Sequence, residues 1–101
     1  MTDLEITRLC AEAMGLPFDG EAMNGTAVWA HSEPRNGHEY IYTPLTKDAQ
    51  AMALVKKCVL GLAWSGYWSV YEQGNGAIGS HIDLNRAICE CVAKMQSRGK
   101  S

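Results

Sequence analysis

The stretch that most constrains the fold is SHIDLNRAICECVAKMQ, residues 80–96. Its apolar side chains recur at the three- and four-residue spacing of an amphipathic helix. They form one stripe: Leu84, Ala87, Ile88, Cys91, Val92 and Met95. Asp83 stands where a helix N-cap is expected, so the pattern predicts a helix over residues 84–97. A second layer of structure must cover the apolar stripe.

Two further helices are expected. The first covers residues 2–14, because Thr2 and Glu5 form a capping box and Gly15 stands where the helix should end. Residues 16–26 contain an Asp-Gly and an Asn-Gly pair, which predict a loop after this helix.

The other helix is expected over residues 47–60, where apolar residues again keep helical spacing. Thr46 is placed to cap its start and Gly61 to end it. Pro44, just before, should end the preceding strand.

Two groups of residues predict strands. Residues 27–31 and 38–42 flank a loop that is rich in turn residues, which indicates a β-hairpin. Residues 62–73, rich in aromatic and β-branched side chains, predict a further strand. Alternation along it places Trp64 and Trp68 on one face, toward the core, and Tyr67 and Tyr71 on the other. A short strand is also expected around Ala77 and Ile78.

Together these elements predict one α+β domain over residues 1–101, with a small antiparallel sheet and three helices. The layered arrangement expected is an α–β–α sandwich, with helices on both faces of the sheet or packed on one. No internal repeat divides the chain.

Charge and hydropathy exclude several classes of protein. Eleven acidic residues against nine lysines and arginines give a net charge of −2, which does not suit a protein that grips a phosphate backbone. Direct nucleic-acid binding is therefore not expected. The longest apolar runs are too short to span a membrane, and the first residues lack the basic start of a signal peptide, so we expect a cytoplasmic protein.

The residues that could carry chemistry do not form a known catalytic or metal motif. Cys10, Cys58, Cys89 and Cys91 lack the spacing of zinc ligands and should remain thiols. Ser80 beside His81 is not a nucleophile elbow. We therefore expect no metal, no cofactor and no enzymatic activity.

The entrance to the last helix is the candidate binding site. His81, Asp83 and Arg86 gather there after a glycine-rich turn, and a helix N-terminus presents unpaired N–H groups. Asp83 places a negative charge where a phosphate would sit, but it suits an amino group or ribose hydroxyls. The alternative is that these residues only cap the helix.

Two segments carry a resemblance to a known family. In YTPLTKDAQ, the aromatic residue, the Pro-Leu pair and the acid are Tyr42, Pro44, Leu45 and Asp48; in IDLNRA, Asp83, Arg86 and Ala87 open the last helix. Both resemble the bacteriophage ABA-sandwich domain proteins. The resemblance spans most of the chain and implies the fold more than the function.

A fainter similarity, by residue type, links the chain to phage proteins that sequester cyclic nucleotide signals, such as the anti-Thoeris sponges. It implies ligand-binding roles for Tyr71, His81, Asp83 and Arg98. With Arg86 from the helix entrance, these residues make up the predicted ligand site. We accordingly expect a homo-oligomer in the host cytosol that captures a nucleotide-derived defence signal. The alternative is a protein–protein inhibitor of a host defence complex, such as a CRISPR effector.

Overall fold

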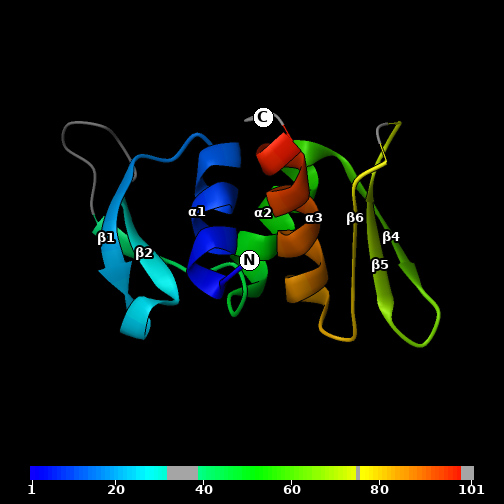
Figure 1. Cartoon of the computed structure of the whole chain (residues 1–101), viewed down its shortest axis with the longest axis horizontal. Helices are drawn as coiled ribbons and strands as arrows, with labels where there is room; N and C mark the ends of the chain where they lie inside the picture. The colour runs from blue at the N-terminus through cyan, green and yellow to red at the C-terminus, as the bar shows by residue number, and fades with distance from the viewer. Residues whose placement is uncertain (32–38, 75, 99–101) are drawn as a thin grey trace.

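The computed structural model describes residues 1–31, 39–74 and 76–98. In these residues, helices α1 (Asp3–Ala13), α2 (Asp48–Cys58) and α3 (Leu84–Arg98) lie between two small antiparallel sheets (Figure 1). The first sheet contains β1 (Phe18–Ala22), β2 (Ala27–His31) and β3 (Glu39–Tyr42) in that order. The second contains β4 (Leu60–Trp64), β5 (Trp68–Glu72) and β6 (Ile78–His81), also in sequence order. A 3-10 turn, Met23–Gly25, joins β1 to β2.

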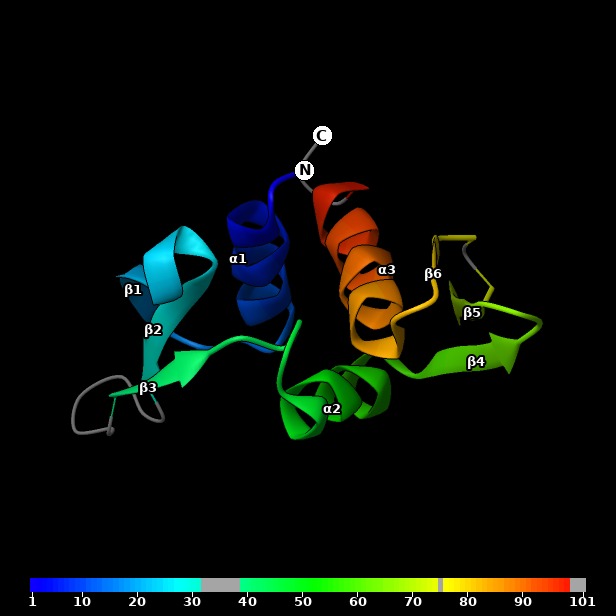
Figure 2. The same ribbon diagram turned by 90° about the horizontal axis from the view of Figure 1, so that it is seen from below.

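The α+β class, with three helices and antiparallel strands, is confirmed. The strands form two sheets, one at each end of the molecule, and the helices form the middle layer (Figures 1 and 2). This differs from a single sheet between helices because α1 and α3 pack between the two groups of strands. Each group pairs locally through short connections, as consecutive strands usually do.

Helix α1 and α3 begin where the sequence predicts. The Thr2 side chain accepts a hydrogen bond from the Glu5 amide at 3.1 Å, which confirms the N-cap of α1. The Asp83 carboxylate accepts from the Asn85 amide at 3.0 Å, which confirms the N-cap of α3.

Both ends of α2 differ from the prediction. Its N-cap residue is Lys47, without a side-chain cap, because the hydroxyl of Thr46 contacts that of Thr43 at 3.1 Å. The helix ends at Cys58, and Val59 takes the left-handed conformation with φ 53°. Gly61 does not end the helix but lies in β4, where a Cβ atom would be 2.2 Å from the ring of Tyr71.

Two strand predictions are also corrected. The expected loop over residues 16–26 contains β1, whose pairing with β2 shifts at a bulge next to Gly20 (φ 65°). Residues 62–73 are not one strand but the hairpin β4–β5, because Gly66 adopts φ 86° and turns the chain. The hairpin predicted from residues 27–31 and 38–42 is confirmed in β2 and β3; His38 and its loop lie outside the described residues.

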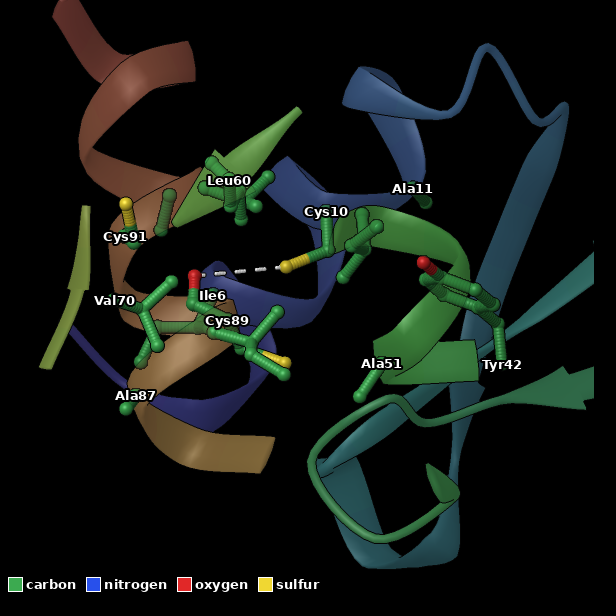
Figure 3. Packing of buried hydrophobic residues seen from close by; sticks show 14 of the residues in the cluster. Ile6, Cys10, Ala11, Tyr42, Ala51, Leu60, Val70, Ala87, Cys89 and Cys91 are labelled. Atoms are coloured by element: carbon green, nitrogen blue, oxygen red, sulfur yellow. Dashed lines mark hydrogen bonds between the residues drawn. The ribbon is translucent and has the colours of Figure 1, made fainter. Parts of the chain in front are cut away.

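The core lies where α1, α3 and the inner faces of both sheets meet. Small residues dominate the facing surfaces of α1 and α3, and the Cys10 thiol lies 3.7 Å from the carbonyl oxygen of Cys89 (Figure 3). On the other side of α3, a Cβ atom on Gly79 would lie 2.1 Å from the carbonyl oxygen of Ala87. β6 therefore lies directly against the helix backbone. In the described part of the chain, no helix is long and apolar enough to cross a membrane.

Candidate functional site

The entrance to α3 is a hydrogen-bonded cap. The Asp83 amide donates to Nδ1 of His81 at 2.9 Å, while the Asp83 carboxylate caps the helix. The side-chain amide of Asn85 donates to Asp48 at 2.8 Å and so joins the start of α3 to the start of α2. His81 and Asp83 are thus brought together, as the sequence predicts, and both take part in the cap.

Arg86 and Arg98 lie in ion pairs at different places along α3. The guanidinium of Arg86 binds the carboxylate of Asp3, on the side of α3 that faces α1. Arg98 binds Glu72 at 2.9 Å, and this contact raises the pKa of Arg98. The 15 residues of α3 span about 20 Å, so Arg98 lies at the opposite end of the helix from Asp83.

Tyr71 lies on the outer face of the second sheet, away from the helices. Its ring covers Gly61 on the neighbouring strand and remains 41% exposed. Tyr71, Arg86 and Arg98 therefore lie on different sides of the molecule. Within one chain, the five predicted residues do not line a common pocket around the α3 entrance.

The end of the second sheet carries a group of aromatic side chains that we call the aromatic tip: Trp64, Tyr67, Trp68 and His81. Strand register aligns Trp64, Trp68 and His81 in one row across β4, β5 and β6. The two indole rings lie 5.2 Å apart between centroids, tilted by 54°. Tyr67, in the turn between them, is 48% exposed.

Trp64 corrects the expectation that both tryptophans are buried in the core. Trp68 does pack against the core, but Trp64 is 56% exposed. The reason is the position of Trp64 at the far end of β4: α3 packs mainly on β6 and β5, and β4 lies in the core at Leu60 but becomes exposed toward Trp64. Strand alternation gave the correct face for Trp64, but only the width of the helix layer decides how far that face is covered.

The chemistry of the aromatic tip is that of a binding surface. Because Nδ1 of His81 accepts a hydrogen bond, the neutral ring carries its proton on Nε2, which is then a donor. An exposed indole offers a flat, polarisable face on which a planar ring can stack. Stacking on Trp64 together with a hydrogen bond from His81 would suit a heterocyclic ligand.

The largest hollow described on the surface is elsewhere, between the edge strand β3 and the start of α2. It has a volume of about 560 Å³. Its lining residues are Met23, Tyr40, Ile41, Lys47, Asp48, Ala49 and Gln50. None of the five predicted residues lines this hollow.

The cysteines contribute to packing. Contact with Cys89 and burial raise the pKa of Cys10, and burial raises the pKa of Cys91 to about 11. These thiols therefore stay protonated and poorly nucleophilic near neutral pH. Across residues 1–31, 39–74 and 76–98, no three histidine, cysteine or acidic side chains are grouped to hold a metal ion.

Comparisons with protein-family models, curated proteins and solved structures find no match to this chain. The resemblance to the phage ABA-sandwich domain proteins therefore stays a prediction from the sequence.

Proposed function

We propose that this chain is a non-catalytic binding protein that captures a nucleotide-derived defence signal on the aromatic tip. The observation that carries the proposal is the exposure of the Trp64 indole beside Trp68 and His81. Exposed apolar side chains that cluster on a small domain, unlike isolated ones, indicate a binding surface.

The chemistry of such a signal fits this surface. Cyclic oligonucleotides and cyclic ADP-ribose isomers carry purine rings, which stack on aromatic side chains, and ring nitrogens, which accept hydrogen bonds. The Nε2–H group of His81 is the donor in the same row as the two tryptophans. This proposal moves the centre of the predicted site from Asp83 to Trp64 and keeps His81 within it.

Binding is favoured over catalysis because the other predicted groups already have partners. Asp83 caps α3, Arg86 pairs with Asp3, and Arg98 pairs with Glu72. In this proposal the protein acts in the cytoplasm of an infected host cell by lowering the free concentration of the signal.

The test is native mass spectrometry of the protein after incubation with a panel of cyclic dinucleotides and cyclic ADP-ribose isomers. We expect a mass shift with one of them, together with quenching of tryptophan fluorescence. Trp64→Ala should abolish both signals. Trp29→Ala, which removes an exposed indole from the first sheet, is the matched control and should leave the mass shift intact. Equal binding by wild type and Trp64→Ala would place the ligand elsewhere.

A second candidate function is inhibition of a host defence complex through a protein surface. The outer face of the second sheet favours it, because Tyr71 and Ile78 lie opposite one another on β5 and β6 and are 41% and 48% exposed. Small residues surround them, which makes a flat apolar surface of the kind found in the centre of protein interfaces.

The two candidates use opposite faces of the same sheet, so variants separate them. Tyr71→Ser combined with Ile78→Ser should disrupt co-purification with a CRISPR effector if the second function holds, and should not affect capture of a small ligand. Loss of the mass shift in this double variant, with the fold retained, would contradict a site confined to the aromatic tip.

A further inference from the structure

The exposed edges of the two sheets are not equivalent, and three of the four are protected against pairing with another strand. The β1 edge carries a bulge between Asp19 and Glu21, two charged residues that disfavour an incoming strand. At the β3 edge, the side-chain amide of Gln50 is hydrogen-bonded to the backbone of the strand. It accepts from the Thr43 amide at 2.7 Å and donates to the carbonyl of Ile41 at 3.2 Å.

The β6 edge is covered by α3. The Lys94 ammonium donates to the carbonyl of Ile78 at 2.6 Å. A side chain of the helix thus satisfies a backbone group that an incoming strand would use.

The β4 edge is different: Leu60, at its start, is buried in the core, and exposure rises along the strand to Trp64. Its residues, Leu60 to Trp64, include no charged residue and no proline, and its pairing with β5 runs without a bulge. Figure 2 shows β4 running away from the helices along the border of its sheet. An apolar, regular edge strand of this kind is a template for another strand.

Hydrogen bonding within the sheet indicates which groups of β4 point outward. The Glu72 amide donates to the carbonyl of Ala77 at 2.9 Å, toward β6. Because neighbouring residues of a strand bond in opposite directions, Tyr71 bonds toward β4, where its partner is Gly61. The N–H and C=O groups of Leu60, Leu62 and Trp64 therefore point away from β5.

We propose that β4 pairs with β4 of a second copy of this chain, antiparallel and about a two-fold axis at Leu62. In this register Leu62 lies opposite the partner's Leu62, and Leu60 lies opposite the partner's Trp64. All three outward-pointing residues then exchange both backbone hydrogen bonds with the second copy. The two second sheets become one continuous six-stranded sheet.

The sequence of β4 is what selects a second copy as the occupant. Leu60, Leu62 and Trp64 share one face, so the two-fold register places leucine beside tryptophan at both ends and leucine beside leucine in the middle. On the other face, Gly61 lies opposite the partner's Ala63, which leaves room for the ring of Tyr71. No charge opposes another charge, and the same strand supplies both halves of the interface, as a two-fold interface requires.

Sedimentation equilibrium of the full chain from micromolar to millimolar concentration tests this pairing. We expect a species with twice the mass of one chain. Leu62→Pro removes one outward N–H group from β4 and should yield a monomer that keeps its far-ultraviolet circular dichroism. Ser80→Pro is the matched control, because it removes an outward N–H group from β6, and it should leave the dimer intact. A wild-type chain that stays monomeric at millimolar concentration would overturn the proposal.

Amide hydrogen exchange of the wild-type protein provides a test that needs no variant. The amides of Leu60, Leu62 and Trp64 should become protected as the protein concentration rises, while exposed turn amides should not change. If these three amides exchange rapidly at every concentration, the self-pairing is wrong, even if the chain dimerises through another surface. The result is independent of ligand capture, because neither experiment includes a ligand.

Discussion

The two sheets have the same number of strands and the same strand order, but their edge strands are protected to different degrees. The first sheet has its two edges protected, by a bulge with charged residues at β1 and by Gln50 at β3. The second sheet has one covered edge, β6, and one apolar edge, β4. The first sheet is therefore built to remain unpaired, while the second can accept a further strand.

The distribution of exposed apolar side chains follows the same division. The first sheet and its turn expose Met23 and Trp29. The second sheet and its flanking residues expose a larger set: Val59, Trp64, Tyr67, Tyr71, Ile78 and Ile82. Isolated exposed apolar residues are ordinary, but a cluster on one part of a small domain indicates a binding surface. The comparison makes the second sheet the candidate for a partner-binding surface.

The largest expected effect is the dependence of the free energy of unfolding on alkaline pH, and it tests whether the two sheets share one core. Burial raises the pKa of Cys91 to about 11, and the pKa values of Cys10 and Tyr42 are raised as well. The unfolded chain releases these protons at lower pH than the folded chain does. The stability that they contribute is therefore complete below about pH 9 and is lost as the pH rises toward about 11 and beyond.

Urea unfolding at a series of pH values measures this dependence. We expect the free energy of unfolding to fall steadily above about pH 9. Circular dichroism and tryptophan fluorescence should report the same transition, because α1 and α3, on which the two sheets pack, contact each other and share one core. A free energy that stays constant from neutral to strongly alkaline pH would contradict the burial of these groups.

The next effect tests how tightly the second sheet is attached to the helices. Gly79→Ala places a methyl group against the backbone of α3, which cannot move aside locally. We expect a loss of about 3 kcal/mol in the free energy of unfolding. Ser80→Ala, on the next residue and exposed, should change it by less than about 0.5 kcal/mol. Chemical denaturation of both variants measures the difference, and equal stabilities would show that β6 is not in direct contact with the helix.

Removing the protection of the β3 edge should have a smaller effect. Gln50→Ala leaves the Thr43 amide and the Ile41 carbonyl without their present partner, at a cost of about 2 kcal/mol. Gln73→Ala, the same truncation at an exposed position beyond β5, should cost less than about 0.5 kcal/mol. If the Gln50 variant is as stable as the Gln73 variant, the edge is not held by this side chain, and the contrast between the sheets weakens.

The smallest effect on the free energy of unfolding is expected at Gly61, the other glycine where a Cβ atom would overlap a neighbouring residue. Gly61→Ala also creates an overlap, but here the neighbour is the half-exposed ring of Tyr71, which can swing into solvent. We expect a loss of about 1 kcal/mol, less than for Gly79→Ala. Thermal unfolding measures it, and adding Tyr71→Ala should recover part of the loss. A loss as large as that of Gly79→Ala would mean that the Tyr71 ring is held rigidly.

Local signals in the sequence predicted the helices and the position of some candidate site residues. Thr2 and Asp83 cap α1 and α3 because a side-chain oxygen at an N-cap needs only the next few backbone amides. The pairing of His81 with Asp83 followed from the same local geometry. Strand alternation predicted that Tyr71 lies on the face opposite the core and left open whether that face is covered; the structure shows that it is exposed.

Other features depended on contacts between residues far apart in the sequence. Gly61 has the sequence pattern of a helix end but lies in a strand because the ring of Tyr71 occupies the space of a side chain. Lys94 and Arg98 have the pattern of a solvated tail, yet they bind Ile78 and Glu72. Ion pairs such as Arg86 with Asp3 join opposite ends of the chain, and no local pattern encodes them.

The sequence by itself determined the three amphipathic helices, the β2–β3 hairpin and the N-caps of α1 and α3, because these depend on periodicity and on neighbouring backbone groups. The tertiary structure decided the layers. The first sheet packs on α1 and the second on α3, which covers mainly β6 and β5. The far end of β4, with Trp64, is therefore exposed, so the candidate binding surface arises from packing between elements and not from any single motif.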